Sequence, residues 1–224
     1  MKLYTHPIST TCRPIMMFAA EQGIPLDMQV VDLFTGEHTK APYGAINPNH
    51  LIPVLEDGDF QLTESSAIMK YLAEKAGSPL YPKDLQQRAR VNERMDWINT
   101  QLGREFCYGV VYPQIFPHHK RRSAEAQEAT LQWGKEHAQR WLKVLDENIL
   151  GPGNNYLCGD SLTIADFYGA AFLTLGEVVG CRFSDYPNVQ RWLGRMKALK
   201  SWKQVNETLD GVVAANKDKS FVSI

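Results

Sequence analysis

The chain has 224 residues, of which 44% are apolar and 22% are charged, and its formal net charge at neutral pH is −1. A chain of this length buries enough apolar surface to fold unaided as one or two domains. The near-zero net charge offers no electrostatic basis for binding nucleic acid or an anionic membrane surface, so we expect neither as a partner.

The four cysteines, Cys12, Cys107, Cys158 and Cys181, form no Cys-x-x-Cys pair. A chain of this size does not need disulfides, which favours a reducing compartment and a cytoplasmic location. The N-terminal residues contain no apolar run of the kind found in a signal peptide, and the longest nearly uncharged stretch, 167–176, is too short to cross a bilayer. We therefore expect no membrane-spanning segment.

The first 76 residues show short strand and helix patterns in alternation. In chain order we expect a strand at 2–5, a helix capped by Thr10 or Thr11 and ending at Gly23, an alternating strand at 27–32, a weak helix toward Tyr43, a hairpin of 54–56 with 60–62, and a helix at 64–76. This order predicts an α/β unit whose sheet combines parallel and antiparallel strand pairs.

The residues after a Pro/Gly-rich segment at 77–82 are predicted to be almost entirely helical. Apolar residues spaced by three and four from Val91 to Phe106 indicate one face of a long helix, which Pro113 and Pro117 are expected to interrupt. A later helix begins at Thr163, where Asp166 can complete a capping box. We expect an α/β domain at 1–77, a linker at 78–86 and an all-helical domain at 87–224.

The residues alone suggest few sites for chemistry. Ser9 lies between a strand and a helix start, where it could simply cap the helix, and no Gly-x-Ser-x-Gly motif supports a serine triad. Cys12 is expected to be a packing residue. No spacing of histidines suits a metal, so none is expected, and the basic run 118–122 indicates a solvated loop and helix start.

The most informative stretch is 47–55. Pro53 stands at the start of an apolar strand and removes a ladder donor, which leaves the backbone of Leu51 and Ile52 free to pair with another chain. The helix start at Glu64 and Ser65 presents bare N–H groups and a positive dipole end. Together these features predict a site for an extended peptide that carries a carboxylate.

Several stretches across the whole chain resemble cytosolic glutathione transferases of the serine type, namely the theta, delta and phi-like classes, and suggest a bacterial member. The matching stretches are Ser9-Thr10-Thr11-Cys12-Arg13, Val31 to His38, Asn47 to Pro53, Thr63-Glu64-Ser65, Tyr112 to Phe116 and Thr163 to Asp166. The resemblance implies a glutathione transferase fold, in which the α/β domain at 1–77 is thioredoxin-like and binds glutathione and the all-α domain at 87–224 forms the electrophile site. It also implies a homodimer, and glutathione as a co-substrate with no cofactor.

The resemblance also implies roles for individual residues. Ser9 would activate the glutathione thiol, and Pro53 would be a cis proline that follows the peptide-binding residue Ile52. The glutathione site would further contain Leu51, with His38 and His50 at the glycyl end, and Glu64, Ser65 and Asn99 at the γ-glutamyl end. Delta-class enzymes have an arginine at the position of Ser66, and this departure leaves the γ-glutamyl end incomplete.

The expected reaction is conjugation of glutathione to a hydrophobic electrophile, by addition or by displacement of a halide. Four aromatic residues on the long helix are candidates for the acceptor site, although their spacing also suits core or interface positions: Phe106, Tyr108, Tyr112 and Phe116. The alternatives are a glutathione-dependent peroxidase or dehalogenase, and a glutathione-binding or interaction module without turnover.

Overall fold

The computed structural model describes residues 1–224. The N-terminal part contains β1 (Lys2–Thr5), α1 (Arg13–Gln22), β2 (Asp27–Val30), η1 (Glu37–Thr39), α2 (Ala41–Ile46), β3 (Val54–Asp57), β4 (Phe60–Thr63) and α3 (Ser65–Lys75). The remainder is helical, with α4 (Leu85–Trp97), η2 (Ile98–Leu102), η3 (Arg104–Val111), α5 (Tyr112–Ile115), η4 (Pro117–His119), α6 (Ala124–Val144), η5 (Leu145–Leu150), α7 (Ile164–Thr174), η6 (Leu175–Val179), α8 (Pro187–Lys197) and α9 (Lys200–Asn216).

The four strands form one sheet in the order β2-β1-β3-β4. β1 runs parallel to β2 and antiparallel to β3, and β3 and β4 form a hairpin. Leu3 on β1 lies opposite Leu55 on β3, and both side chains are buried. The mixed sheet and the helical C-terminal part confirm the predicted fold class.

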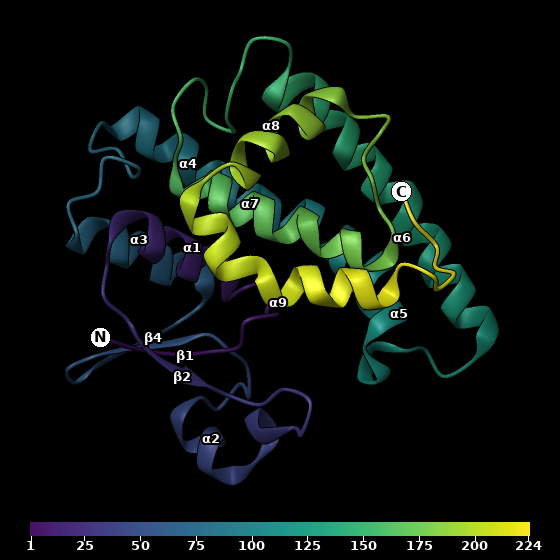
Figure 1. Ribbon diagram of the computed structural model, residues 1–224, viewed down its shortest axis with the longest axis horizontal. Coiled ribbons are helices and arrows are strands. Elements are labelled where there is room, and N and C mark those ends of the chain that lie inside the picture. The colour runs from purple at the N-terminus through teal and green to yellow at the C-terminus, as the bar shows by residue number, and fades with distance from the viewer.

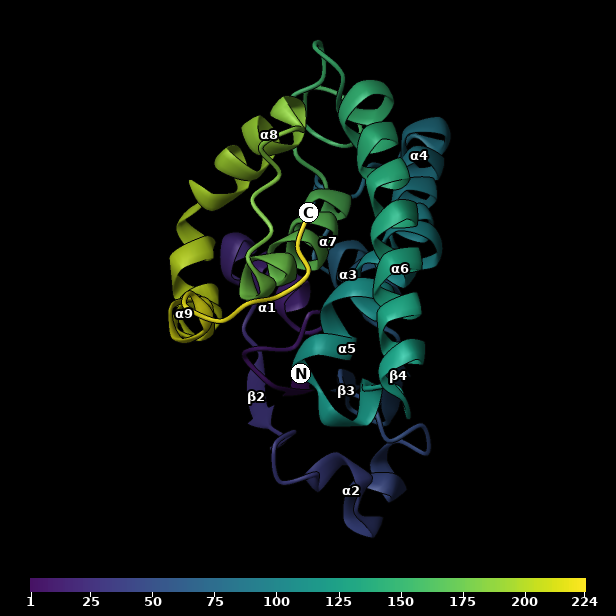
Figure 2. The same cartoon turned by 90° about the vertical axis from the view of Figure 1, so that its right-hand side faces the viewer.

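The sheet is covered on both faces by different helices (Figures 1 and 2). α2 lies on one face, where Tyr43 packs with Val31 and Val54. α1 and α3 cover the other face and also contact α7, while α1 contacts α9 as well. One cluster of 42 buried apolar residues runs from Leu3 in the sheet to Val205 in α9. The two parts of the chain therefore share a continuous core, and their relative position is set by packing.

The start of α1 differs from its prediction. The helix begins at Arg13 after Cys12, which makes no side-chain capping bond, so neither Thr10 nor Thr11 is the N-cap. The Ser9 hydroxyl oxygen instead accepts from the Cys12 N–H at 3.3 Å. The predicted end is confirmed, because Gly23 has the left-handed conformation (φ 65°) that glycine adopts at low cost.

The long helical run across the second part is interrupted later than predicted. α4, η2, η3 and α5 follow one another as far as Ile115, and Pro113 lies in the first turn of α5, where no backbone donor is needed. The chain leaves the helix at Phe116, which is extended (φ −112°, ψ 121°) because Pro117 follows it. The predicted interruption at Pro117 is thus confirmed, whereas the prediction of an interruption at Pro113 was wrong.

α7 begins with the predicted capping box of Thr163 and Asp166. The Asp166 carboxylate is fully buried and also accepts from the Leu157 N–H at 2.8 Å and from the Trp192 indole at 3.0 Å. Burial raises the pKa of this carboxyl to about 6. The residue therefore joins the start of α7 to the preceding loop and to α8, which helical periodicity could not predict.

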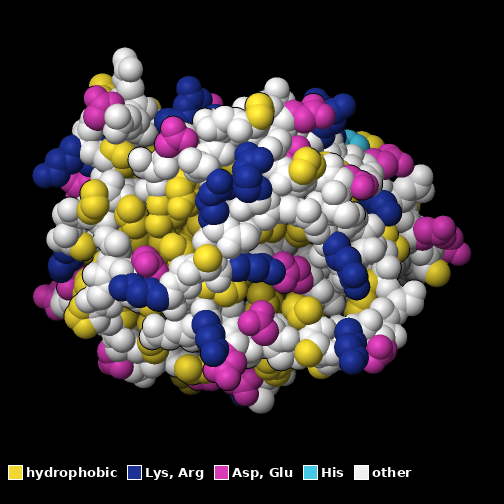
Figure 3. All heavy atoms as spheres, turned by 45° about the horizontal axis from the view of Figure 1, so that its top comes forward, with side chains coloured by type: hydrophobic (Ala, Val, Ile, Leu, Met, Phe, Trp, Pro, Cys, Tyr) yellow, Lys and Arg dark blue, Asp and Glu magenta, His cyan; other side chains and the backbone are white.

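The surface carries both signs of charge in close mixture. On the face shown in Figure 3, lysine and arginine side chains alternate with aspartate and glutamate side chains, and apolar groups lie between them. None of the helices combines the length and the apolar character that a bilayer crossing requires.

Candidate active site

Ser9 lies in the loop between β1 and α1, and its side chain is half-buried. Its N–H donates to the His6 carbonyl at 2.9 Å, and its own carbonyl accepts from the Arg13 N–H at 3.0 Å. These bonds form the tight turn that leads into α1 and hold the Ser9 hydroxyl beside the first backbone donors of the helix. Cys12, by contrast, is fully buried, and burial raises the pKa of its thiol. The structure thus leaves the hydroxyls of Ser9 and Thr11 as the partly accessible polar groups of this loop.

Thr11 connects the Ser9 loop to the strand entrance at Ile52. The Thr11 hydroxyl donates to the Ile52 carbonyl at 3.2 Å and lies 3.2 Å from the Ser9 hydroxyl. Because a hydroxyl has only one proton to donate, the Ser9 hydroxyl must be the donor to Thr11. In the free protein the Ser9 hydroxyl therefore directs its hydrogen toward the Thr11 oxygen. An anion bound at Ser9 would receive this hydrogen bond only after the Ser9 hydroxyl had rotated away from Thr11. Thr11 could not be assigned from the sequence, because its partner lies 41 residues away.

Arg13 was also not assigned. It is fully buried, and its guanidinium donates to Asn206 at 2.8 Å and to Thr174 at 3.2 Å. Burial without a carboxylate partner lowers the pKa of this arginine to about 10. The contacts attach the first residue of α1, and with it the Ser9 turn, to α7 and α9.

The loop before β3 is organised by polar side chains behind it. The Leu51 carbonyl accepts from the Tyr43 hydroxyl at 2.8 Å and from the buried Asn47 amide at 2.6 Å, while the Leu51 side chain points to solvent. The Ile52–Pro53 peptide bond is cis. The Ile52 N–H makes no hydrogen bond within the chain, which leaves one backbone donor without a partner in the residue that Thr11 joins to the Ser9 loop.

His38 and His50 lie together at one end of this loop. The His50 ring is 2.9 Å from the His38 carbonyl, and it packs so closely on Gly44 that a Cβ there would lie 2.7 Å from the ring. The buried Nδ1 of His38 has no hydrogen-bond partner. Burial lowers the pKa of His38, and the nearby His118 and His50 lower it further. The two predicted histidines therefore form one polar group with an unused ring nitrogen.

Glu64 and Ser65 lie at the start of α3, at the other end of the loop. Glu64 is exposed in a left-handed conformation (φ 66°) and makes no capping bond, so the first N–H groups of α3 have no side-chain partner. The buried Ser65 hydroxyl is 3.4 Å from the hydroxyl of Tyr168 on α7. Tyr168 was not predicted, because it lies within a nearly continuous apolar helix.

Asn99 is exposed on η2, and no hydrogen bond joins it to α3. The acidic residue that faces α3 is Asp96, one turn earlier, which lies 3.9 Å from Lys70. Lys70 follows Ser66 by four residues, so both lie on the same face of α3. The structure thus pairs a cation of α3 with a carboxylate of the long helix, and neither residue could be assigned from the sequence.

Three aromatic side chains line the side of α5 and η3 near these loops, and we call them the aromatic wall: Tyr108, Tyr112 and Phe116. These residues are four positions apart in the chain. The ring centroids are 4.8 Å apart for Tyr108 and Tyr112 and 5.3 Å apart for Tyr112 and Phe116. Tyr112 faces the Thr10 hydroxyl, and burial raises its pKa.

Two predictions for this region require correction. Phe106 is fully buried against Phe183 and Gly176, so it belongs to the core and cannot line an acceptor site. The run at 118–122 is a loop and helix start as predicted, but the ring of His119 packs on Tyr112 at 5.1 Å and that of His118 packs on Phe116 at 5.7 Å. The two histidines therefore extend the aromatic wall.

Comparison with known proteins agrees with this geometry. The model of the glutathione S-transferase N-terminal domain matches residues 8–75, and that of the C-terminal domain matches residues 106–200. The chain is 33% identical over 201 residues to human glutathione S-transferase theta-1, a match that spans 88% of this chain and 82% of the human protein. The chain belongs to the glutathione S-transferase family.

Solved structures of other glutathione transferases share the whole architecture. A delta-class glutathione transferase from Nilaparvata lugens superposes with a TM-score of 0.79 and 31% identity, over 96% of this chain and 98% of its own. Human glutathione transferase theta-2, in a complex with glutathione and an unknown ligand, gives a TM-score of 0.82 and 29% identity, over 100% and 93% of the two chains. Membership of the serine-type classes and a bacterial origin stay predictions.

Proposed function

We propose that this glutathione transferase activates the glutathione thiol with Ser9 and conjugates it to hydrophobic electrophiles. Glutathione would bind to residues 1–77, the electrophile would bind against residues 87–224, and residues 78–86 would connect the two domains. We expect the chain to act as a homodimer, as the resemblance implies. The complex of human theta-2 with glutathione supports the choice of co-substrate.

The observation that carries the proposal is a row of unused polar groups around Ser9. The Ile52 N–H makes no bond within the chain, the first turn of α3 is uncapped, and the buried Nδ1 of His38 has no partner. An extended tripeptide with a carboxylate at each end would satisfy these groups together, because buried polar groups without partners cost free energy. Ser9 lies beside the middle of this row, where the cysteinyl sulfur would lie.

The γ-glutamyl carboxylate would bind at Glu64, Ser65 and the N-terminus of α3, whose dipole favours an anion. The exposed Asn99 would contribute less than the pair of Lys70 and Asp96. We propose that Lys70 supplies the cation that delta-class enzymes carry at the position of Ser66. The electrophile would bind against the aromatic wall, where all three rings offer apolar faces and Tyr108 and Tyr112 also offer hydroxyl donors.

Product analysis tests this function against its alternatives. With glutathione and an aryl halide, the protein is expected to form the thioether and to release halide in equal amount. A peroxidase would instead oxidise glutathione to the disulfide with an organic hydroperoxide, and a dehalogenase would turn over a haloalkane far faster than the aryl halide. Glutathione binding in calorimetry without turnover of any of these substrates would contradict the proposal and leave a binding module.

Thr11→Val tests whether Thr11 positions the site. Valine keeps the shape of threonine but cannot donate to the Ile52 carbonyl, so the loop that would bind the cysteinyl backbone loses one neutral hydrogen bond, worth about 0.5–1.5 kcal/mol. We expect KM for glutathione to rise by roughly three- to tenfold, with a smaller change in kcat. Thr11→Ser should restore the KM. An unchanged KM in Thr11→Val would show that Thr11 plays no part.

A further inference from the structure

The turn that carries Ser9 is closed by two hydrogen bonds to His6. The His6 carbonyl accepts from the Ser9 N–H at 2.9 Å, which is the bond between the first and fourth residues of a β-turn, and Pro7 occupies the second position that favours proline. The His6 ring adds the other bond, because its Nδ1 accepts from the Ile8 N–H at 3.3 Å. The main chain and the side chain of one residue therefore hold both backbone donors that follow Pro7.

The bond to Ile8 requires a neutral ring. An imidazole nitrogen accepts a hydrogen bond only when it carries no hydrogen, so His6 must have its hydrogen on Nε2. The ring is buried, with 8% of the residue exposed, and it packs at 75° to the ring of Phe34 with the centroids 5.5 Å apart. Burial lowers the pKa of His6, and the charge of Asp32 on the loop after β2 raises it in part. The neutral ring is thus the form present at neutral pH.

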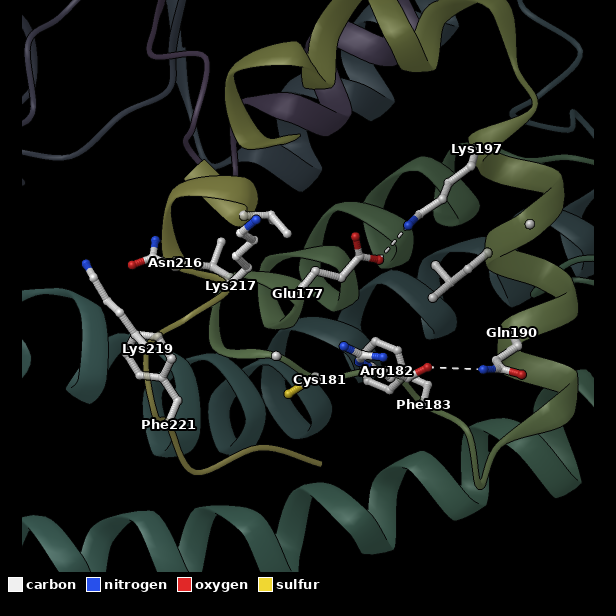
Figure 4. A pocket seen from close by; sticks show the side chains of 15 residues that line it. Glu177, Cys181, Arg182, Phe183, Gln190, Lys197, Asn216, Lys217, Lys219 and Phe221 are labelled. Carbon is white, nitrogen blue, oxygen red and sulfur yellow. Dashed lines mark hydrogen bonds and ion pairs between the residues drawn. The ribbon is translucent and has the colours of Figure 1, made fainter. Parts of the chain in front are cut away.

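The other contacts of the turn are apolar. Ile8 packs with Val178 of η6 and Leu209 of α9. The acid beside Val178 on η6 is Glu177, which pairs with Lys197 at 2.6 Å at the edge of a cavity between η6 and α8 (Figure 4). The side chain of Ile8 is therefore fixed by packing, and its backbone N–H depends on the His6 ring for an acceptor.

We propose that His6 is a positioning residue for thiol activation, whose unprotonated Nδ1 holds the turn in which Ser9 meets the sulfur. This role depends on the proposed role of Ser9. Protonation would place a hydrogen on Nδ1, so the Ile8 N–H would lose its acceptor and the imidazolium would be attracted to Asp32. The Ser9 hydroxyl would then be held less firmly where it donates to the thiolate. Loss of one neutral hydrogen bond should lower the rate about three- to tenfold.

NMR of the free wild-type protein tests the bond between His6 and Ile8 without any dependence on catalysis. At about pH 7.5 the His6 ring is expected to carry its hydrogen on Nε2 and none on Nδ1. When the pH is lowered, the Ile8 amide signal should shift in step with protonation of this ring. His6→Asn identifies the ring signals by their absence. A hydrogen on Nδ1 at about pH 7.5, or protonation of the ring without a shift of the Ile8 amide signal, would overturn the proposed role.

Two substitutions separate the acceptor from the titratable ring. His6→Asn keeps an acceptor atom at the δ position of the side chain but cannot titrate, whereas His6→Leu has no acceptor. At about pH 7.5, kcat/KM is expected to fall about three- to tenfold in His6→Leu, with little change in KM for glutathione, and to stay near the wild-type value in His6→Asn. Equal kcat/KM values in the two variants would contradict the role of Nδ1.

The pH dependence provides a readout that a purely structural histidine would not change. The ratio of the wild-type kcat/KM to that of His6→Asn cancels the ionisation of the thiol, which both proteins share. This ratio should fall about three- to tenfold as the pH is lowered through the His6 pKa measured by NMR, because only the wild-type residue gains a proton. A ratio that stays constant through this pKa would overturn the proposed role.

The double variant with Ser9→Ala shows whether His6 acts through Ser9. In the Ser9→Ala background, His6→Leu should change kcat/KM by less than about twofold, because the hydroxyl that the turn positions is already absent. Reduced activity in Ser9→Ala together with full activity in His6→Leu would overturn the role of His6 and leave the proposed function standing. Full activity in Ser9→Ala would contradict the proposed function, and with it the catalytic role of His6.

Discussion

Replacing Ser9 with alanine is expected to raise the pKa of the bound glutathione thiol by about one and a half units, to about 8. The Ser9 hydroxyl would donate one hydrogen bond to the thiolate, worth about 1.5–3 kcal/mol for a charged acceptor, and the start of α1 would add about 0.3–1 kcal/mol. The two contributions together amount to about 2.7 kcal/mol, which corresponds to two pKa units, and the Ser9 hydrogen bond supplies most of this free energy. The thiolate absorbance of the binary complex measured against pH gives this shift directly.

The effect on the rate separates two contributions. A free thiol of pKa about 8.5 is about 3% ionised at pH 7, and lowering its pKa to about 6.5 raises that fraction to about three-quarters. Nucleophilicity falls with the pKa, so ionisation alone accelerates the reaction only about threefold. Correct placement of the sulfur supplies the larger part of the rate increase, up to about a hundredfold. We therefore expect Ser9→Ala to lower kcat/KM at pH 7 by a factor of between about three and a hundred.

The matched control is Ser9→Thr, which keeps a hydroxyl at the same position and should retain the low thiol pKa. In the wild-type enzyme kcat/KM should rise with pH through about 6.5, and in Ser9→Ala it should rise through about 8, because only the thiolate reacts. An unchanged pH profile and rate in Ser9→Ala would remove Ser9 from the mechanism. Thr10, whose hydroxyl faces Tyr112, would then be the next candidate.

The second large effect concerns stability. Asp166→Ala is expected to lower the free energy of unfolding by about 3–5 kcal/mol, because it removes a helix cap and leaves the buried donors of Leu157 and Trp192 without an acceptor. For a chain of this size the midpoint of thermal unfolding should fall by about 10 °C. Thermal unfolding should be measured at pH 7.5. This pH lies above the pKa of about 6 of Asp166, so the carboxylate is ionised and accepts from every donor.

Asp160→Ala provides the control for this prediction. Asp160 is an exposed acid six residues earlier and bonds only to the exposed Asn155, so its removal should leave the unfolding midpoint unchanged. Asp166→Ala should also leave the thiol pKa of any folded fraction unaltered, because Asp166 lies away from the Ser9 loop. A midpoint within one degree of the wild type would show that the converging donors find other partners.

The alternation of strand and helix patterns, the Asp57-Gly58 hairpin, the glycine after α1 and the capping box of α7 could all be predicted, because each depends on residues that are close in the chain. The same holds for the bare start of α3 and for the free backbone at Ile52. The roles of Ser9, His38 and His50 in binding glutathione rest on the resemblance to a family and stay predictions.

The tertiary structure decided which side chains meet across long separations. Thr11 reaches Ile52, and Ser65 reaches Tyr168. On the long helix the acidic residue that pairs with α3, at Lys70, is Asp96 and not the residue at position 99. Helical spacing could not distinguish the buried Phe106 from the aromatic wall, because residues of one face belong to the core or to the surface according to what packs on them. The sequence alone therefore indicated the order of the strands and helices, the bare start of α3 and the free donor at Ile52, whereas packing between the domains determined which side chains lie around them.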